Sequence, residues 1–404
     1  MDLKSGYPWW AIRNGLLHAF PPLHQDLHCD VAVLGAGITG ALIADELAGH
    51  GHDVIVIDQR DVGWGSTAAS TALLQYEIDT PMLDLAHRYG EDDALLAYRA
   101  CADAVGLLRD KAKALGAVDF AMADSLYYAS KPRHLKPMLE EYALRRRHGF
   151  PVRWLDAADV SERFGFAAPG AILSGLAATV DPYRFCYRLL QRLERAGTRV
   201  FDRTTVARVL ADRRGVALHT TDGCVVRARH LVVAAGYESQ GLLGERVARN
   251  RSSYAFVTDP IRGDALHRLR RTMLWESARP YLYLRTTRDG RIIAGGEDDA
   301  IDVPDKRDAR LGRKTDALMK KVRALLPGVE MQPVFSWAGT FAETEDGLPF
   351  FGPHRKHGPR VHFAMAYGGN GITYSMLGAG LLRALIERRK HPLADLFSFA
   401  RLDR

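Results

Sequence analysis

One β-α-β unit near the N-terminus constrains the fold of this chain more than any other feature. Residues 31–34 and 54–57 are short apolar runs with β-branched side chains, which are typical of buried strands. Residues 38–50, between them, favour a helix that Gly51 ends. Because the connections are very short, the two strands are expected to be parallel, with the helix as their crossover. The unit predicts an α/β fold with a doubly wound parallel sheet.

The turn between the first strand and the helix has the spacing Gly35-x-Gly37-x-x-Gly40. In this context Gly35 permits a tight turn, Gly37 lets the backbone approach a pyrophosphate at the helix N-terminus, and Gly40 lets helix and strand pack closely. Asp58 ends the second strand, where an acidic side chain accepts hydrogen bonds from a ribose diol and disfavours a 2′-phosphate. The pattern predicts a dinucleotide other than NADP; a plain α/β turn without a ligand is the alternative.

The segment that follows separates two possible dinucleotides. Residues 63–72 are small or carry hydroxyl groups, at a place where an NAD dehydrogenase would continue its alternation of strands and helices. Small residues let the backbone lie against a flat ring, and hydroxyl groups bind phosphate oxygens. The segment therefore favours FAD over NAD, although a capped helix start would have a similar composition.

Composition narrows the class of protein further. A chain of 404 residues exceeds one ordinary core, so two domains are expected. The net charge is +7, but the basic residues lie in short helical patches such as 145–147, which does not favour nucleic acid as a partner. The four cysteines show no CxxC pairing, so we expect neither a metal site nor disulfides. Without a membrane-span-length apolar run or a signal peptide core, the sequence predicts no membrane span and a cytoplasmic location.

The remaining pattern is interleaved. Helices are expected at 81–115, 135–148, 182–196, 316–326 and 372–389. Strands at 200–201, 206–210, 216–220 and 224–226 are expected to form an antiparallel meander, with further strands at 126–130, 231–234, 254–258, 281–286, 292–295 and 361–367. The expected domains are a discontinuous Rossmann-like dinucleotide domain at 1–117, 181–245 and 336–404, and an α+β substrate domain with an antiparallel sheet at 118–180 and 246–335.

Three further segments complete a resemblance that spans nearly the whole chain. They are residues 205–209, residues 232–236, and the pair 346–352 and 367–373. With these segments, the sequence is similar to the superfamily of FAD-dependent amine oxidoreductases that includes D-amino-acid oxidase, glycine oxidase and sarcosine oxidase. In residues 234–236 an alanine, Ala235, stands where the family usually has threonine, so one hydroxyl group is lost.

The resemblance implies FAD as the cofactor. A helix starting at Gly371 would aim its free N–H groups at the flavin pyrimidine carbonyl and raise the flavin's reduction potential. Non-covalent binding is expected, because the cysteine that links FAD in some sarcosine oxidase relatives lies in the C-terminal half, and residues 250–404 contain none. The expected cofactor-binding residues are Gly35, Gly37, Ile38, Thr39, Gly40, Asp58, Gln59, Ser66, Thr67, Ala68, Ser70, Thr71, Ala72, Val206, Ala235, Gly236, Gly369, Asn370, Gly371, Ile372 and Thr373.

The residues that could bind the substrate are less clearly indicated by the sequence than those that bind the cofactor. The aromatic residues of the second β-rich block can wall an amine or face the core. The candidate catalytic residues are Asn370, Tyr283 and Tyr254, and the candidate substrate-binding residues are Tyr281, Phe341, Arg285 and Glu276. Arg285 can bind a carboxylate, but we interpret it as a surface residue; Glu276 can pair with a cationic amine.

One departure from the family pattern concerns the substrate. In amino-acid-oxidising relatives, an arginine in a Trp-x-Gly-x-Arg-Pro segment grips the substrate carboxylate, and Phe341 stands at that position here. The sequence therefore predicts oxidation of a small amine without an α-carboxylate, by hydride transfer to the flavin, with oxygen or another acceptor taking the electrons. The alternatives are an amino-acid oxidase or dehydrogenase with a relocated carboxylate grip, an NAD-dependent dehydrogenase, and a non-catalytic flavin-fold subunit.

Overall fold

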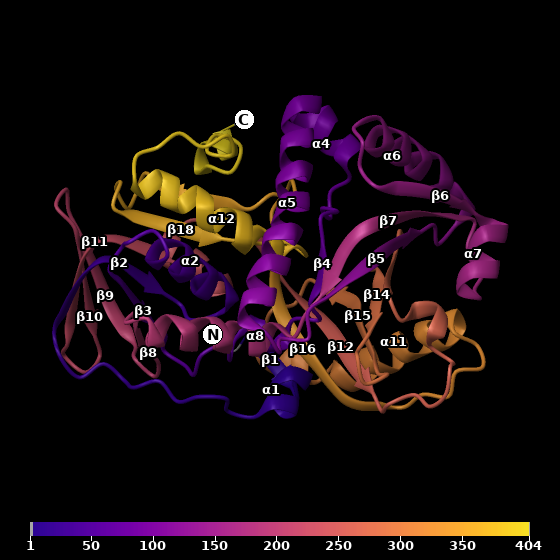
Figure 1. Ribbon diagram of the computed structural model, residues 1–404, viewed down its shortest axis with the longest axis horizontal. Helices are drawn as coiled ribbons and strands as arrows, with labels where there is room; N and C mark the ends of the chain where they lie inside the picture. Colours follow the sequence, from indigo (N-terminus) through magenta and orange to yellow (C-terminus); the bar gives the residue numbers. More distant parts are fainter. Residues whose placement is uncertain (1–2, 404) are drawn as a thin grey trace.

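Two large sheets lie side by side in the computed structural model, which describes residues 3–403. The first sheet is on the left of Figure 1 and the second on the right, and the long helix α5 (Glu91–Leu115) stands between them. Both sheets are assembled from segments far apart in the sequence, so the interleaved organisation expected from the sequence is present. Within residues 3–403, no helix combines the length and apolar character needed to cross a membrane.

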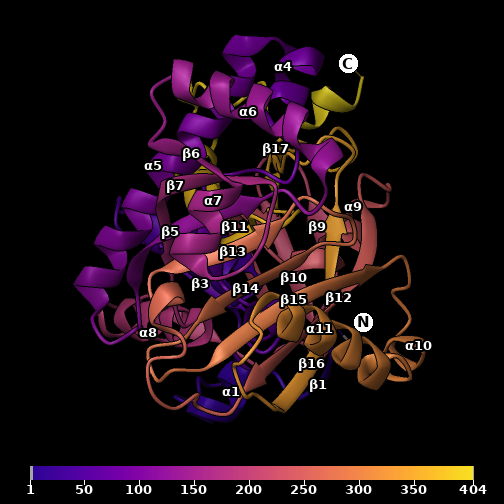
Figure 2. The same cartoon turned by 90° about the vertical axis from the view of Figure 1, so that its right-hand side faces the viewer.

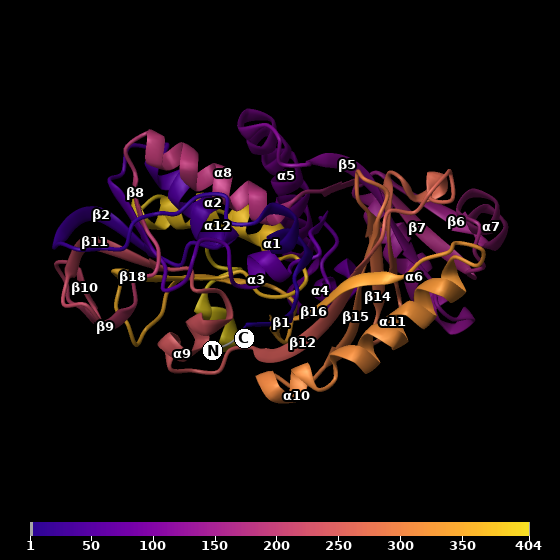
Figure 3. The same ribbon diagram turned by 90° about the horizontal axis from the view of Figure 1, so that it is seen from below.

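The first sheet is the parallel, doubly wound sheet that the β-α-β unit predicts. Its strands run in the order β17 (Phe350–Pro353), β18 (Val361–Met365), β11 (Val225–Val233), β2 (Leu27–Leu34), β3 (Val54–Ile57) and β8 (Arg199–Phe201). All four side chains of β3 are buried, which explains its uninterrupted apolar sequence. Three helices pack side by side on this sheet (Figure 3): α2 (Ile38–Ala48), α8 (Pro182–Arg195) and α12 (Gly371–Ile386). As expected, the Asp181 side chain caps α8 by accepting from the N–H of Arg184.

One strand prediction was wrong. Strand β8 pairs in parallel with β3, Val56 opposite Val200, and takes no part in a meander. The meander contains only β9 (Val206–Ala211), β10 (Val216–Thr220) and the start of β11. The reason is that β8 follows the crossover helix α8, which returns the chain to the parallel sheet, and a three-residue strand carries too short a pattern to reveal this.

The second sheet has ten strands and is mostly antiparallel. Their order is β1 (Lys4–Gly6), β16 (Pro333–Glu343), β12 (Arg249–Thr258), β15 (Ile292–Asp299), β14 (Leu282–Thr286), β13 (Thr272–Glu276), β5 (Ala121–Tyr128), β7 (Gly170–Thr179) and β4 (Leu73–Gln75), and β6 (Val152–Asp156) pairs with β7. Helix α11 (Leu311–Leu325) packs against β12, β15 and β16, at the front of Figure 2. The remaining helices are α1 (Trp9–Asn14), α3 (Ser66–Ala69), α4 (Met82–Tyr89), α6 (Leu135–Arg147), α7 (Ala157–Phe164), α9 (Ser239–Leu243) and α10 (Pro304–Asp308), with short 3-10 turns at Pro132–His134, Gly236–Glu238, His267–Leu269 and Phe399–Asp403.

The boundary expected at residue 336 does not coincide with a sheet boundary. Strand β16 pairs with β12 along its length, so residues 336–343 belong to the second sheet. Strands β1 and β4, from the first hundred residues, are also part of that sheet. The chain therefore crosses between the two sheets more often than the expected domain bounds indicate.

Candidate functional site

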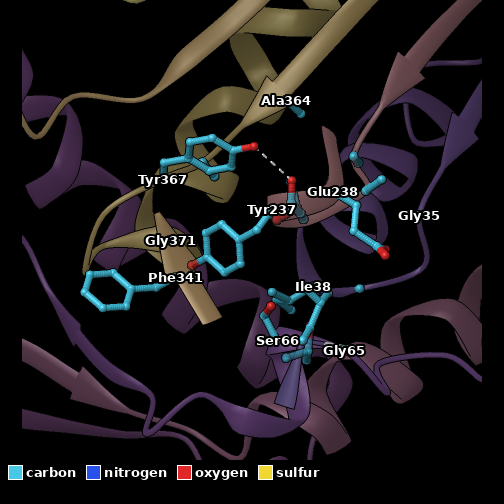
Figure 4. Close-up of a pocket in the computed structure, with 18 of the residues that line it drawn as sticks. Gly35, Ile38, Gly65, Ser66, Tyr237, Glu238, Phe341, Ala364, Tyr367 and Gly371 are labelled. Atoms are coloured by element: carbon cyan, nitrogen blue, oxygen red, sulfur yellow. Dashed lines mark hydrogen bonds between the residues drawn. The ribbon is translucent and has the colours of Figure 1, made fainter. Parts of the chain in front are cut away.

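A cavity of about 1000 Å³ extends between the two sheets. It begins at the glycine turn after β2, passes α3 and β4, and ends against β12, β14, β15 and β16 of the second sheet. In Figure 4 the rings of Phe341, Tyr237 and Tyr367 lie toward one end, and Gly35 and Glu238 lie toward the other. The cavity thus joins the dinucleotide motif to the sheet that was expected to hold the substrate.

The glycine turn has the backbone geometry that its spacing predicts. Gly35 has φ +118°, and a Cβ atom there would lie 2.3 Å from the carbonyl oxygen of Ala234. A Cβ atom on Gly40 would lie 1.8 Å from the carbonyl oxygen of Gly35, so only glycine lets α2 approach the turn. Gly37 has an ordinary φ of −77° and caps α2 with its backbone against the cavity. Side chains are therefore excluded at Gly35 and Gly40 by the fold itself, and at Gly37 by the space a ligand would need.

Asp58 lies at the cavity wall at the end of β3. Its Oδ2 accepts from the N–H of Ala36 at 2.7 Å and its Oδ1 from the N–H of Arg60 at 2.8 Å. Burial raises the pKa of Asp58 to about 6, and these two backbone hydrogen bonds oppose the shift. At neutral pH the side chain is a carboxylate that can still accept from ribose hydroxyl groups. Glu238, which the sequence did not single out, receives bonds from Gln59 and Arg60 beside it.

The small-residue segment forms a platform along the cavity. The Thr67 hydroxyl accepts from the N–H of Ile38 at 3.0 Å, which fixes α3 against the glycine turn. Ser66 lines the cavity, and its hydroxyl oxygen is buried without a hydrogen-bond partner among residues 3–403. An orphaned hydroxyl beside a helix N-terminus suits a phosphate oxygen. Ala72 has φ +54°, a strained value for a residue with a side chain, at the point where the segment turns into β4.

The C-terminal glycine turn closes the cavity from the opposite side. Gly371 begins α12, and its first backbone N–H groups have no acceptor within the helix. The Asn370 side chain donates to the carbonyl oxygens of Gln75 and Glu77, at 3.1 and 2.8 Å. Asn370 therefore ties the turn to the end of β4, and because its Nδ2 is engaged in these two bonds, the geometry favours a positioning role over the catalytic role that we expected.

Together these features fit FAD. One elongated space is surrounded by all the groups described above. They are the N-termini of α2 and α12, the Ser66 hydroxyl without a partner, the glycine turn after β2 and the Asp58 carboxylate. Every cofactor-binding residue expected from the sequence lines this space except Gly40 and Ala68, which support the turn from behind. Tyr237 and Tyr367 also line this space but were not among the expected residues, although Tyr237 directly follows Gly236 and Tyr367 ends the strand expected at 361–367. The Tyr367 hydroxyl donates to the carbonyl oxygen of Gly236 at 3.2 Å (Figure 4).

Two candidate substrate-binding residues, Tyr281 and Phe341, and one candidate catalytic residue, Tyr283, line the far end of the cavity. They lie there together with Trp275 and two carboxylates, Asp79 and Asp298, that the sequence did not single out. The Tyr283 hydroxyl lies 3.1 Å from the Ser253 hydroxyl. The sequence signal for this wall was the pair Tyr281 and Tyr283, two residues apart at the start of β14.

Tyr254, Glu276 and Arg285 do not line the cavity, so their proposed roles need correction. Tyr254 is in the core on the opposite face of β12, because its neighbours on that strand, Ser253 and Ala255, face the cavity. The Glu276 carboxylate already accepts from the Ser130 hydroxyl and the N–H of Leu282.

Arg285 is buried, not on the surface, and its guanidinium donates to the carbonyl oxygens of Thr71 and Val180. It supports the small-residue segment from behind, and burial lowers its pKa to about 10. A single charged residue on an alternating strand gives no sign of such backbone acceptors, which come from distant segments.

Fold and cavity together define a dinucleotide-dependent oxidoreductase with a separate substrate sheet. The family model described as "FAD dependent oxidoreductase" matches residues 30–385, so the chain belongs to this family and uses FAD, which rules out the NAD-dependent alternative. It is 27% identical to glycine oxidase of Geobacillus kaustophilus over 92% of this chain and 96% of that one. It is 24% identical to gamma-glutamylputrescine oxidoreductase of Escherichia coli over 94% and 88% of the two chains. The crystal structure of L-proline dehydrogenase from P. horikoshii has the same fold, with a TM-score of 0.79, 18% identity, and 95% and 99% of the chains covered.

These findings identify an FAD-dependent oxidoreductase of amines or amino acids.

The first prediction concerns whether the flavin is covalently attached to the protein. We expect acid precipitation to release all the flavin into the supernatant as FAD, because no cysteine is among the described residues that line the cavity. Chromatography of the supernatant checks the nucleotide; FMN, or yellow colour left in the protein pellet, would contradict non-covalent FAD binding.

Proposed function

We propose that this enzyme oxidises a C–N bond of a small amine that lacks an α-carboxylate, with oxygen as the final electron acceptor. The observation that carries the proposal is the charge of the substrate end of the cavity. Asp79 and Asp298 line it, whereas the arginines among the described lining residues, Arg60 after β3 and Arg208 in β9, lie at the adenosine end. Phe341 occupies the position of the family's carboxylate-binding arginine.

When bound, FAD supplies the acceptor for a hydride from the carbon next to nitrogen. The chain's own contribution is placement and exclusion of water. Tyr281, Tyr283, Trp275 and Phe341 give a mostly aromatic wall that can hold an amine against the flavin site. Such placement accounts for a large share of the rate when no strong protein base is needed.

The curated relatives leave two substrate classes open. Gamma-glutamylputrescine oxidoreductase agrees with an amine, whereas the name glycine oxidase agrees with an amino acid. A specific residue supports the second class: Arg279 lies over the Tyr281 ring, 4.3 Å from its centroid, and donates to the backbone oxygen of Asp79 near the cavity. Arg279 is therefore the arginine to test as a carboxylate-binding residue at a new position, because Arg285 already donates to backbone carbonyl groups.

Rates of flavin reduction separate the two classes. We expect glycine, sarcosine, D-alanine and D-proline to reduce the flavin at least about a hundredfold more slowly than N-methylated amines or 1,4-diaminobutane, because a buried carboxylate without a partner costs about 3 kcal/mol. Stopped-flow spectroscopy without oxygen measures these rates. Rapid reduction by one of the four amino acids would defeat the proposal, and its loss in Arg279→Ala, but not in Arg133→Ala at an exposed site, would establish the amino-acid alternative.

A further inference from the structure

The end of strand β15 carries three consecutive acidic residues with different environments. Glu297 forms ion pairs with Lys314 and Lys321 of α11, at 3.7 and 2.8 Å. Asp299 is paired with Arg310 at the start of the same helix. Asp298, between them, lines the cavity, and its Oδ1 is buried without a hydrogen-bond partner among residues 3–403. Two of the three carboxylates are thus neutralised by the outer helix, and the third faces the site.

A β-bulge produces this arrangement. Ser252 pairs with Asp299 and Tyr254 with Gly296, so two residues, Glu297 and Asp298, oppose Ser253 alone. Gly296 has φ +134° and Glu297 has φ +54°, which is uncommon for a residue with a side chain and costs on the order of 1–2 kcal/mol. Bulges of this kind re-aim side chains and are frequent beside active sites. Here the bulge turns Asp298 toward the cavity.

The surroundings of Asp298 stabilise a cation more than an anion. The neighbouring carboxylate of Asp79 is held by the Tyr281 hydroxyl and the N–H of Gly369, at 3.3 and 2.8 Å. Tyr281 and Tyr283 line the same end, and aromatic rings beside a carboxylate attract ammonium groups.

Asp298 is ionised at neutral pH, because its pKa is raised only to about 6. Burial raises its pKa to about 6, opposed by the Ser253 hydroxyl, and the charges of Asp79 and Glu343 raise it further. Arg279 is the nearby cation; it lowers the pKa of Asp298 but forms no ion pair with it among the described residues. The Glu343 charge is itself paired with Arg251. A buried carboxylate without a cation of its own is costly, and a ligand that supplies one removes that cost.

We propose that Asp298 binds a cationic nitrogen of the substrate, so that the enzyme selects positively charged amines. This inference rests on the proposed function but assigns the recognition residue and the charge of the substrate. The bulge holds the carboxylate, Asp79 fixes the Tyr281 hydroxyl beside it, and the aromatic rings cover the nitrogen substituents.

Binding of a redox-inert cation tests this inference without turnover. Choline is a suitable probe, because its quaternary nitrogen has no lone pair and cannot be oxidised as an amine; 3,3-dimethyl-1-butanol is its neutral isostere. We expect choline to perturb the flavin absorption spectrum of the oxidised holoenzyme and to bind at least tenfold more tightly than the isostere. Asp298→Asn should remove this preference, whereas Asp92→Asn, at an exposed site on α5, should retain it.

The pH dependence provides a second readout on the unaltered protein. Because the carboxylate form binds the cation, choline affinity should be constant above the pKa of Asp298, about 6, and fall as the pH drops through it. Equal binding of choline and its isostere, choline affinity unchanged in Asp298→Asn, or affinity that does not fall at low pH would overturn the inference. The proposed function fails by a different result, namely that amines do not reduce the flavin even though choline binds.

Discussion

Replacing Gly37 with valine is expected to give a folded protein that no longer retains FAD. The backbone of Gly37 has φ −77°, which valine adopts without strain, and the nearest atom to an added Cβ is the Thr67 hydroxyl at 3.1 Å. The valine side chain would instead occupy the cavity at the N-terminus of α2, where the pyrophosphate binds. We expect the affinity for FAD to fall at least about a thousandfold, equivalent to roughly 4 kcal/mol.

The flavin-to-protein ratio after gel filtration measures this effect, with circular dichroism as the check on folding. Gly106→Val is the matched control, because a side chain at Gly106 on α5 meets no atom within 4 Å. A Gly37→Val protein with the flavin content of the unaltered chain would show that the glycine turn does not hold the cofactor. The same change at Gly40 would be uninformative, since the clash with the Gly35 oxygen would unfold the turn.

Arg401→Ala should be the most destabilising single replacement near the C-terminus. Arg401 is buried, and its Nε donates to Oδ2 of Asp346 at 2.6 Å. The other guanidinium nitrogens donate to the carbonyl oxygens of Leu348, Pro349 and Leu396. Removing the side chain leaves a buried carboxylate and three carbonyl groups without this donor, and losses of this kind cost about 3–5 kcal/mol.

The expected decrease appears in the free energy of unfolding from denaturant titration. Arg389→Ala is the control, since Arg389 is half-exposed and pairs with Glu387 on the surface, where ion pairs contribute about 1 kcal/mol or less. Asp346 is also close to α12, because the Tyr374 hydroxyl of that helix donates to the backbone oxygen of Gly347, the residue after Asp346. A loss of stability no larger than in the control would show that Arg401 does not stabilise the loop at residues 346–349.

Local patterns explain which parts of the structure were predictable from sequence. The β-α-β unit, the glycine turn and Asp58 lie within thirty residues of one another, so spacing alone placed them. The α8 start at Asp181 was equally local, since the cap and the first proline are neighbours.

Features that depend on distant segments were not predictable in this way. The pairing of β8 depends on β3, more than a hundred residues earlier, and the burial of Arg285 depends on carbonyl groups of Thr71 and Val180. Asp298 escaped notice because its neighbours Glu297 and Asp299 give the segment the composition of an exposed acidic end, and only the bulge separates their directions.

Anaerobic reduction of the bound flavin by a panel of amines distinguishes an amine oxidoreductase from a flavin-binding subunit. We expect at least one amine without an α-carboxylate to remove the absorbance of the oxidised flavin completely, with one carbonyl product formed per flavin reduced and recovery of the absorbance when oxygen is admitted. If dithionite bleaches the flavin but no amine or amino acid does, the chain is a flavin-binding subunit without amine oxidoreductase activity, which would contradict the proposed function.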